Sequence, residues 1–186
     1  MRREDRVKEW LTGIMIGLIL TLLMTIKAFA AVNGPEDAER AAAALYLEEN
    51  AVEIPEDVTF WAEYYGERYD ICPETIEAVC WVESRCQQTA QDPSKACKGL
   101  MQIKPSCHSD RMARLGVQNI FDIAGNINVG TDYLAELGGS EEIAVALAIY
   151  NGQSEDAVER TRQGEYKGYV KQVLTISQAL ERAHGK

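Results

Sequence analysis

The chain has 186 residues, which is enough for one domain with a short appendage and too few for two full catalytic domains. Apolar residues make up 46% and charged residues 26%, the balance of an ordinary globular protein, which argues against disordered, collagen-like and multi-pass membrane proteins. The net charge of −10 lacks the basic footprint of a nucleic-acid-binding protein, so we expect no nucleic-acid partner.

The first 30 residues combine a basic start with a long apolar run. The start holds four basic side chains: Arg2, Arg3, Arg6 and Lys8. Residues 11–26 then carry no charge, and residues 28–30 form an Ala-x-Ala site. This order is typical of a secretory signal, although the run is long for one and slightly short of the roughly 20 residues of a spanning helix.

We therefore expect residues 1–30 to form a hydrophobic helix that is either a signal peptide or an N-terminal membrane anchor. Residues 11–32 are the segment that would enter the membrane. A buried core helix fits less well, because the run is apolar on all sides rather than along one stripe. Both main alternatives place the rest of the chain outside the cytoplasm, in the cell envelope, either secreted or anchored.

Five cysteines gather in one part of the chain: Cys72, Cys80, Cys86, Cys97 and Cys107. In an exported chain such clustering predicts at least one disulfide bond, and the polar loop between Cys86 and Cys97 favours that pair. A zinc site fits poorly, because no Cys-x-x-Cys occurs and His108 is the only histidine near the cluster. We expect neither a metal nor a cofactor.

Beyond residue 30 the pattern predicts helices and almost no strands. An Ala-rich helix is expected from Pro35 to Asn50, with acids in its first turn, and makes residues 31–54 a linker helix. The main domain is expected over residues 55–182. Its predicted helices begin at Pro55 and near Pro105, and cover residues 74–86, 126–137, 141–150 and 166–182. The polar segment 87–103 is expected to hold a very small β or irregular patch, which gives a mainly α fold of the α+β class.

The strongest chemical signal is a glutamate on an apolar helical stripe. Ile76, Val79 and Cys80 are spaced i, i+3 and i+4, and the next position of the stripe is Glu83. Burial there should raise the pKa of its carboxyl group, and an acid still protonated near neutral pH is what general-acid catalysis requires. On periodicity alone, a structural glutamate paired with an arginine or a tyrosine hydroxyl is the more common arrangement.

Five short motifs, in this order, resemble those of the soluble lytic transglycosylases. They are WVESR at 81–85, GLMQI at 99–103, NINVGTDYL at 126–134, AIYNG at 148–152 and YV at 169–170. One such motif would be weak evidence. Five in the order of the family and at about its spacing are strong evidence, and they cover roughly residues 55–175.

The resemblance implies a goose-type, lysozyme-like domain that cleaves the bond between MurNAc and GlcNAc in peptidoglycan glycan strands. It makes Glu83 the single catalytic acid and base: the carboxyl group protonates the glycosidic oxygen and then takes the proton of the muramyl 6-hydroxyl. That hydroxyl closes on the anomeric carbon, and the product is a 1,6-anhydromuramyl end formed without water. A lone carboxylate fits this route, because most glycoside hydrolases use two.

The same match gives roles to further residues. Tyr150 would hold Glu83 through its hydroxyl group. The sugar subsites would be lined by Ser84, Met101, Gln102 and Asn151. Core packing is an equal alternative for Met101, because methionine commonly fills gaps in cores.

Three alternatives remain open at this point. A muramidase that uses water would need a second carboxylate, for which Asp92 is the best candidate, although aspartate before a proline is usually a turn former. A thiol hydrolase would use Cys80 with His108, but a cysteine on an apolar helical stripe is usually structural. The domain could also bind glycan without cutting it, as a component of an envelope-spanning secretion or conjugation machine.

Overall fold

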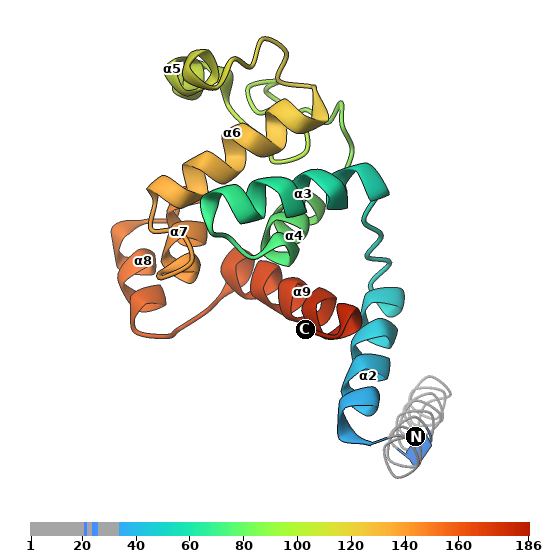
Figure 1. The fold of residues 1–186 in the computed structure, drawn as a ribbon. Helices are drawn as coiled ribbons and strands as arrows, with labels where there is room; N and C mark the ends of the chain where they lie inside the picture. The colour runs from blue at the N-terminus through green and yellow to red at the C-terminus, as the bar shows by residue number, and fades with distance from the viewer. Residues whose placement is uncertain (1–20, 22–23, 26–33) are drawn as a thin grey trace, which may run out of the picture.

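The computed structural model describes Thr21, Met24, Thr25 and residues 34–186 of the chain (Figure 1). Its helices are α2 (Pro35–Glu49), α3 (Glu56–Tyr69), α4 (Pro73–Ser84), α5 (Pro105–Leu115), α6 (Ile123–Glu136), α7 (Ile143–Tyr150), α8 (Glu155–Arg162) and α9 (Gly168–His184). The expected signal peptide or anchor lies outside the described residues except for the three named. In the part of the chain that the structure describes, no helix combines the length and the apolar character needed to cross a membrane.

Helix α4 begins and ends where local chemistry dictates. Pro73 occupies the first turn, where its missing N–H costs no hydrogen bond. Arg85 follows the last turn in the left-handed conformation, with φ 55°; its N–H donates to the carbonyl oxygen of Trp81, and the N–H of Cys86 donates to that of Cys80. The helix therefore ends at Ser84, two residues before the predicted end, and Glu83 lies in its last turn.

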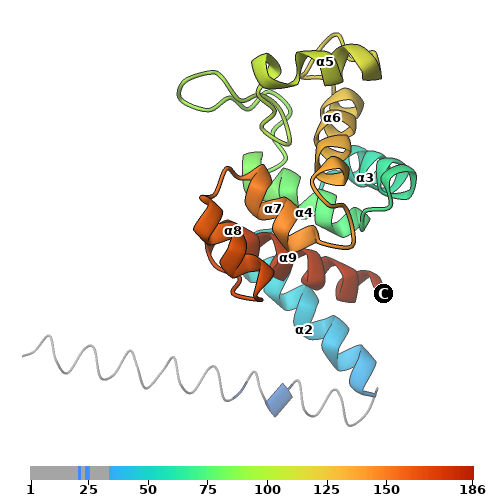
Figure 2. The same cartoon turned by 90° about the vertical axis from the view of Figure 1, so that its left-hand side faces the viewer.

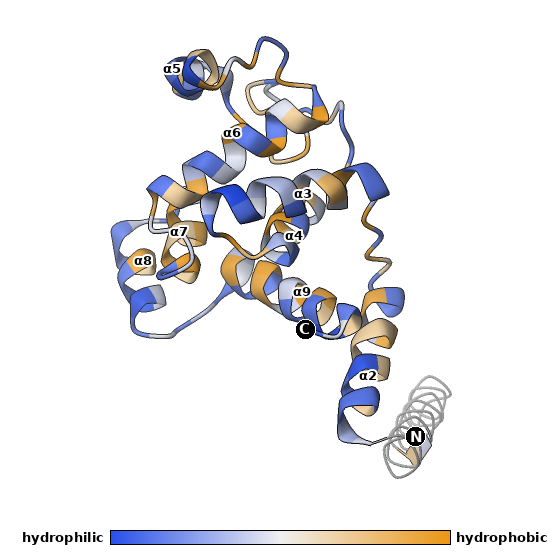
Figure 3. Cartoon of the chain, viewed as in Figure 1, coloured by the Kyte–Doolittle hydropathy of each residue, from blue (hydrophilic) through white to orange (hydrophobic). Residues whose placement is uncertain are grey.

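The core of the molecule surrounds α4. Helices α3 and α9 pack against α4, and α6 packs against α3 (Figures 1 and 2). Ile76 and Val79 of α4 have no solvent exposure, and they meet apolar side chains of α6, α7 and α9 in one cluster. Figure 3 shows α7 as mostly apolar, as expected of a helix in the core, and α8 as largely polar, as expected of a helix at the surface. Burial on so many sides makes α4 the fixed element of the domain.

The segment between α4 and α5 is irregular, as the sequence predicts. Two isolated antiparallel bridges join Gln91 to Lys98 and Lys98 to Ile103. The described residues contain no longer strand, so the fold is mainly helical. The loop leaves the end of α4 and returns beside α6 (Figure 2), and its residues 85–98 are all exposed or half-buried.

Helix α2 is packed onto the domain. It packs across α9 (Figures 1 and 2), and its Ala38 and Ala43 are buried. Small side chains suit this position because they let the two backbones approach closely. Residues 50–55 then lead from α2 to α3 past the end of α4, near Trp81 and Arg85.

Candidate active site

A cleft of about 650 Å³ opens beside the C-terminal end of α4. Three parts of the chain meet there: the last turn of α4, the irregular loop, and the end of α7. The lining residues are Val82, Glu83, Ser84, Arg85, Ala90, Gln91, Asp92, Pro93, Cys97, Gln102, Tyr150 and Asn151. Three of the five motifs thus contribute to one cavity, although they are far apart in the sequence.

Glu83 lies half-buried in the wall of this cleft. Burial raises the pKa of its carboxyl group, because an apolar environment disfavours the charged form. The hydroxyl group of Tyr169, in the first turn of α9, favours the carboxylate and opposes part of this rise in pKa. That hydroxyl is buried and has no hydrogen-bond partner of good geometry among the described residues, so it remains available to the carboxylate. Burial and the Tyr169 hydroxyl group therefore act on the pKa of Glu83 in opposite directions, and burial is the larger effect.

Tyr150 lies near Glu83 in the cleft, and the hydrogen bond of its hydroxyl group goes to another residue than the expected Glu83. Its hydroxyl group donates a hydrogen bond of 2.7 Å to the carbonyl oxygen of Met101. Burial and the nearby Glu83 raise the pKa of this phenol far above its usual value, so it stays a neutral donor. Tyr150 fastens the turn at residues 99–103 to α7, and Tyr169 is the tyrosine beside the carboxyl group. The sequence signal for Tyr169 was its place in the last motif.

Ser84 lines the cleft, but its hydroxyl group is engaged within the protein. It is buried and bonds the carbonyl oxygens of Cys80, at 3.0 Å, and Leu100, at 2.8 Å. The second bond joins α4 to the turn at residues 99–103. Ser84 therefore shapes the cleft by fixing the turn at residues 99–103 to the end of α4.

Met101 lies in the core and does not line the cleft. It has no solvent exposure, and its sulfur atom packs against the Cα of Gly130 on α6 so closely that a Cβ there would collide with it. The expected role in a sugar subsite is therefore replaced by the alternative of core packing. The motif glycine and the motif methionine fit each other, which explains why α6 carries glycine at this position.

Gln102 and Asn151 lie in the cleft lining, as a substrate-binding role requires. Gln102 has a left-handed backbone, with φ 47°, and its amide nitrogen donates to the carbonyl oxygen of Gly99 at 2.9 Å. Asn151 follows the last residue of α7 and is exposed. Their amide groups carry both donors and acceptors, which suits sugar hydroxyl and acetamido groups.

Asp92 lines the same cleft from the irregular loop. Its carboxylate accepts hydrogen bonds from the hydroxyl and N–H of Ser94, and from the N–H of Cys97 at 2.7 Å. These bonds, led by that from the Ser94 hydroxyl, lower the pKa of Asp92. The carboxylate organises the loop as a turn former does, while it also faces the cavity.

The structure has all five cysteines as free thiols, so the expected disulfide between Cys86 and Cys97 is absent from it. Cys80 is fully buried, and burial raises its pKa well above the usual value, while that of Cys86 rises to about 12. A thiolate nucleophile is therefore disfavoured at Cys80. His108 lies on α5 against Arg111, at 2.8 Å, away from that thiol, and the thiol-hydrolase alternative loses its support.

Within the described ranges, no group of three or more histidine, cysteine or acidic side chains is placed to hold a metal ion.

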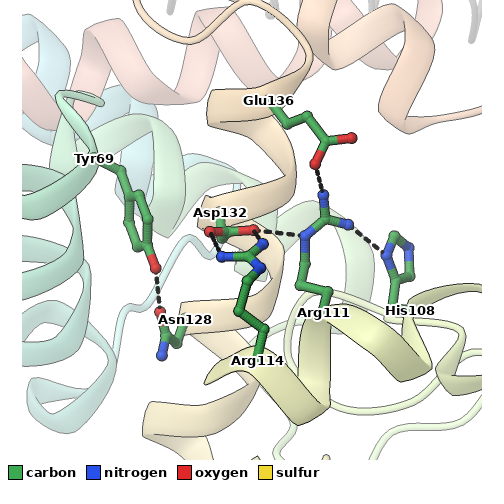
Figure 4. A network of polar contacts seen from close by, with 7 residues as sticks. All are labelled: Tyr69, His108, Arg111, Arg114, Asn128, Asp132 and Glu136. Carbon is green, nitrogen blue, oxygen red and sulfur yellow. Dashed lines mark hydrogen bonds and ion pairs between the residues drawn. The ribbon is translucent and has the colours of Figure 1, made fainter. Parts of the chain in front are cut away.

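A network of ion pairs fixes α5 to α6 (Figure 4). Asp132 accepts hydrogen bonds from Arg111 at 2.6 Å and from Arg114 at 2.7 Å, and Arg111 also pairs with Glu136. Burial would raise the pKa of Asp132, but the two guanidinium groups outweigh it and lower the value. The next residue, Tyr133, contacts Tyr150 with ring centroids 5.4 Å apart. The network thus supports the wall of the cleft from outside it.

A mainly helical fold with a half-buried carboxyl group in an open cleft is consistent with the lysozyme-like class of proteins. The family model of the transglycosylase SLT domain matches residues 60–171, more than half of the chain. The chain belongs to this family. Membership indicates cleavage of peptidoglycan glycan strands of the lytic-transglycosylase type. No curated relative matches the chain.

Proposed function

We propose that this protein is a lytic transglycosylase that cleaves the β-1,4 bond between MurNAc and GlcNAc without water, with Glu83 as its single acid and base. One observation carries the proposal: Glu83 is a half-buried carboxyl group of raised pKa in the wall of a 650 Å³ cleft. Its position in the motif at 81–85, inside the matched family domain, agrees with this role.

In the first step protonated Glu83 gives its proton to the glycosidic oxygen, and the bond from that oxygen to the anomeric carbon of MurNAc breaks. The freed hydroxyl belongs to the departing GlcNAc. In the second step the 6-hydroxyl oxygen of the same MurNAc bonds to the anomeric carbon and its proton passes to the Glu83 carboxylate. The carboxyl group ends as it began, and the product carries a 1,6-anhydro ring.

The surroundings of Glu83 suit both steps. Burial keeps the proton on the carboxyl group before reaction, because it raises the pKa. The Tyr169 hydroxyl favours the charged form and would stabilise the carboxylate between the steps. A group that must act as acid and then as base works best with a pKa near the working pH.

A hydrolytic muramidase is the second candidate, because Asp92 lines the same cleft. Water attack would need this carboxylate as a base. Its oxygen atoms already accept hydrogen bonds from Ser94 and Cys97, which weaken it as a base and favour the route without water.

Mass spectrometry of the muropeptides released from purified peptidoglycan tests the proposal. The full chain should release products lighter by one water than hydrolytic products, and Glu83→Gln should release none. Reducing-end products would show that water attacks and would assign the base role to Asp92. Binding of glycan without any cleavage by the wild-type protein would make the domain a glycan-binding component.

We also propose that the enzyme works outside the cytoplasm, in the cell envelope, where peptidoglycan is. The basic and apolar residues 1–30 support this location through export or anchoring, with residues 11–32 as the membrane segment. An envelope-spanning secretion or conjugation complex is the partner that this location and the small size favour. The mass of the mature protein in membrane and soluble fractions distinguishes a retained anchor from a cleaved signal.

A further inference from the structure

A second hollow, of about 490 Å³, adjoins the cleft. It is lined by Asn50, Ala51, Glu53, Pro55, Trp81 and Arg85. Arg85 also lines the cleft that holds Glu83, so the two cavities meet at this residue. The outer wall of the hollow is the segment that leads from α2 to α3, which the sequence indicated as a linker.

The guanidinium group of Arg85 is held flat in this hollow. Its central carbon lies 3.4 Å from the centroid of the Trp81 ring, at stacking distance. Trp81 is itself buried, so it offers a fixed surface. A stacked guanidinium keeps the N–H donors along its edge free, in the planar arrangement that matches a carboxylate.

Arg85 has no carboxylate partner among residues 34–186, although it is exposed in an acidic protein. By contrast Arg111 and Arg114, the arginines of α5, both pair with Asp132. Glu53 is the other charged residue in the lining of the hollow. Its negative charge repels an anionic group, so of these two charged side chains only Arg85 can bind one.

We propose that Arg85 binds a carboxylate of the stem peptide that hangs from the muramyl residue, and that the second hollow receives this peptide. The inference rests on the proposed function and names a specificity-determining residue for it. The bond that Glu83 would cleave belongs to the sugar that bears the peptide. Arg85 follows two residues after Glu83, so a peptide leaving that sugar is within reach of the hollow.

The test compares cleavage of glycan strands with their stem peptides against strands from which an amidase has removed them. The variants are Arg85→Gln, which keeps the length of the side chain, and Arg85→Lys, which keeps the charge without the planar donors. Arg68→Gln is the matched control, because Arg68 also lies over an aromatic ring, that of Tyr69, and lines neither cavity.

Wild-type protein should prefer peptide-bearing strands, and Arg85→Gln should reduce that preference roughly tenfold, the order expected for one charge-assisted hydrogen bond. The loss of preference should appear mainly in KM for the peptide-bearing strands. Arg85→Lys should keep part of the preference, and Arg68→Gln should leave the preference unchanged. If the wild type is active and Arg85→Gln loses activity equally on both substrates, or on neither, the role of Arg85 alone would be overturned. A wild type that cleaves neither substrate would overturn the proposed function as well.

Discussion

At the scale of single residues, the cleft depends on one carboxyl group and the hydroxyl beside it. Burial raises the pKa of Glu83 and Tyr169 opposes that rise. The first-turn position of Tyr169 on α9 brings a distant part of the chain to the last turn of α4. Tertiary packing thus tunes the pKa of the carboxyl group on which the proposed chemistry depends.

Tyr169→Phe should raise the pKa of Glu83 further, because it removes a group that favours the carboxylate. The alkaline limb of the pH–rate profile should then move to higher pH, while kcat falls by about tenfold, the lower range for a positioned donor. Kinetics on purified peptidoglycan across pH checks both effects. Tyr166→Phe is the control, because Tyr166 is exposed and outside the cleft; an unmoved alkaline limb in Tyr169→Phe would contradict the assignment.

Glu83→Gln should abolish cleavage and stabilise the fold at neutral pH. A carboxyl group with a raised folded pKa binds its proton more tightly in the folded state, so stability is lost as pH rises through that pKa. Gln carries no charge, and the gain should be on the order of 1 kcal/mol. Urea unfolding at neutral pH should show the gain, and at a pH below about 4.3, the unfolded value, it should disappear. If Glu83→Gln and the wild type were equally stable at both pH values, the buried carboxyl group would not destabilise the fold.

At the scale of elements, the turn at residues 99–103 is held by side chains from three helices. Ser84 of α4 and Tyr150 of α7 each donate to a carbonyl oxygen in it. Asn126 of α6 accepts from the N–H of Met101 at 2.8 Å and donates to the carbonyl groups of Lys98 and Ile120. Three of the five motifs therefore support a fourth, and the cleft keeps its shape because these buried polar groups are paired.

Asn126→Ala should destabilise the fold by about 2–4 kcal/mol, because it leaves buried backbone groups without partners. Activity should fall even at temperatures where the variant remains folded, since the turn loses its anchor. Denaturant unfolding and kinetics measure the two effects. Asn119→Ala, at an exposed asparagine, should cost much less, and similar costs for both variants would contradict the anchoring role.

At the scale of the whole molecule, the end of α9 is tied to the start of α4. Glu74 is 1% exposed and accepts hydrogen bonds from Lys186 at 2.7 Å and from Cys72 at 3.1 Å, and it lies 3.0 Å from a ring nitrogen of His184. Burial would raise its pKa, but the hydrogen bonds from Lys186, His184 and Cys72 outweigh it and lower the pKa to about 2. This contact fixes the C-terminal end of α9 to the first turn of α4.

Glu74→Gln should cost about 2 kcal/mol of stability at neutral pH. This figure lies below what the full shift of pKa implies, because Lys186 and His184 are half-exposed to water. A lowered folded pKa gives stability that is present above the unfolded value and is lost as pH falls toward 2. Thermal unfolding of both proteins should therefore converge in acid; a constant difference down to pH 2 would contradict the ion pair.

The sequence by itself determined the mainly helical fold, most helix positions and the family, because turn residues, apolar periodicity and short motifs act locally. It also located Glu83 on the apolar stripe of α4. Even local signals were missed: Ser154 caps α8, and Asp122 caps α6 earlier than predicted. Tertiary structure alone decided that Tyr169 acts on Glu83 while the hydroxyl of Tyr150 bonds Met101, that Met101 packs in the core, and that Arg85 joins two cavities. Such partners depend on how distant helices pack, and no spacing along the chain records that geometry.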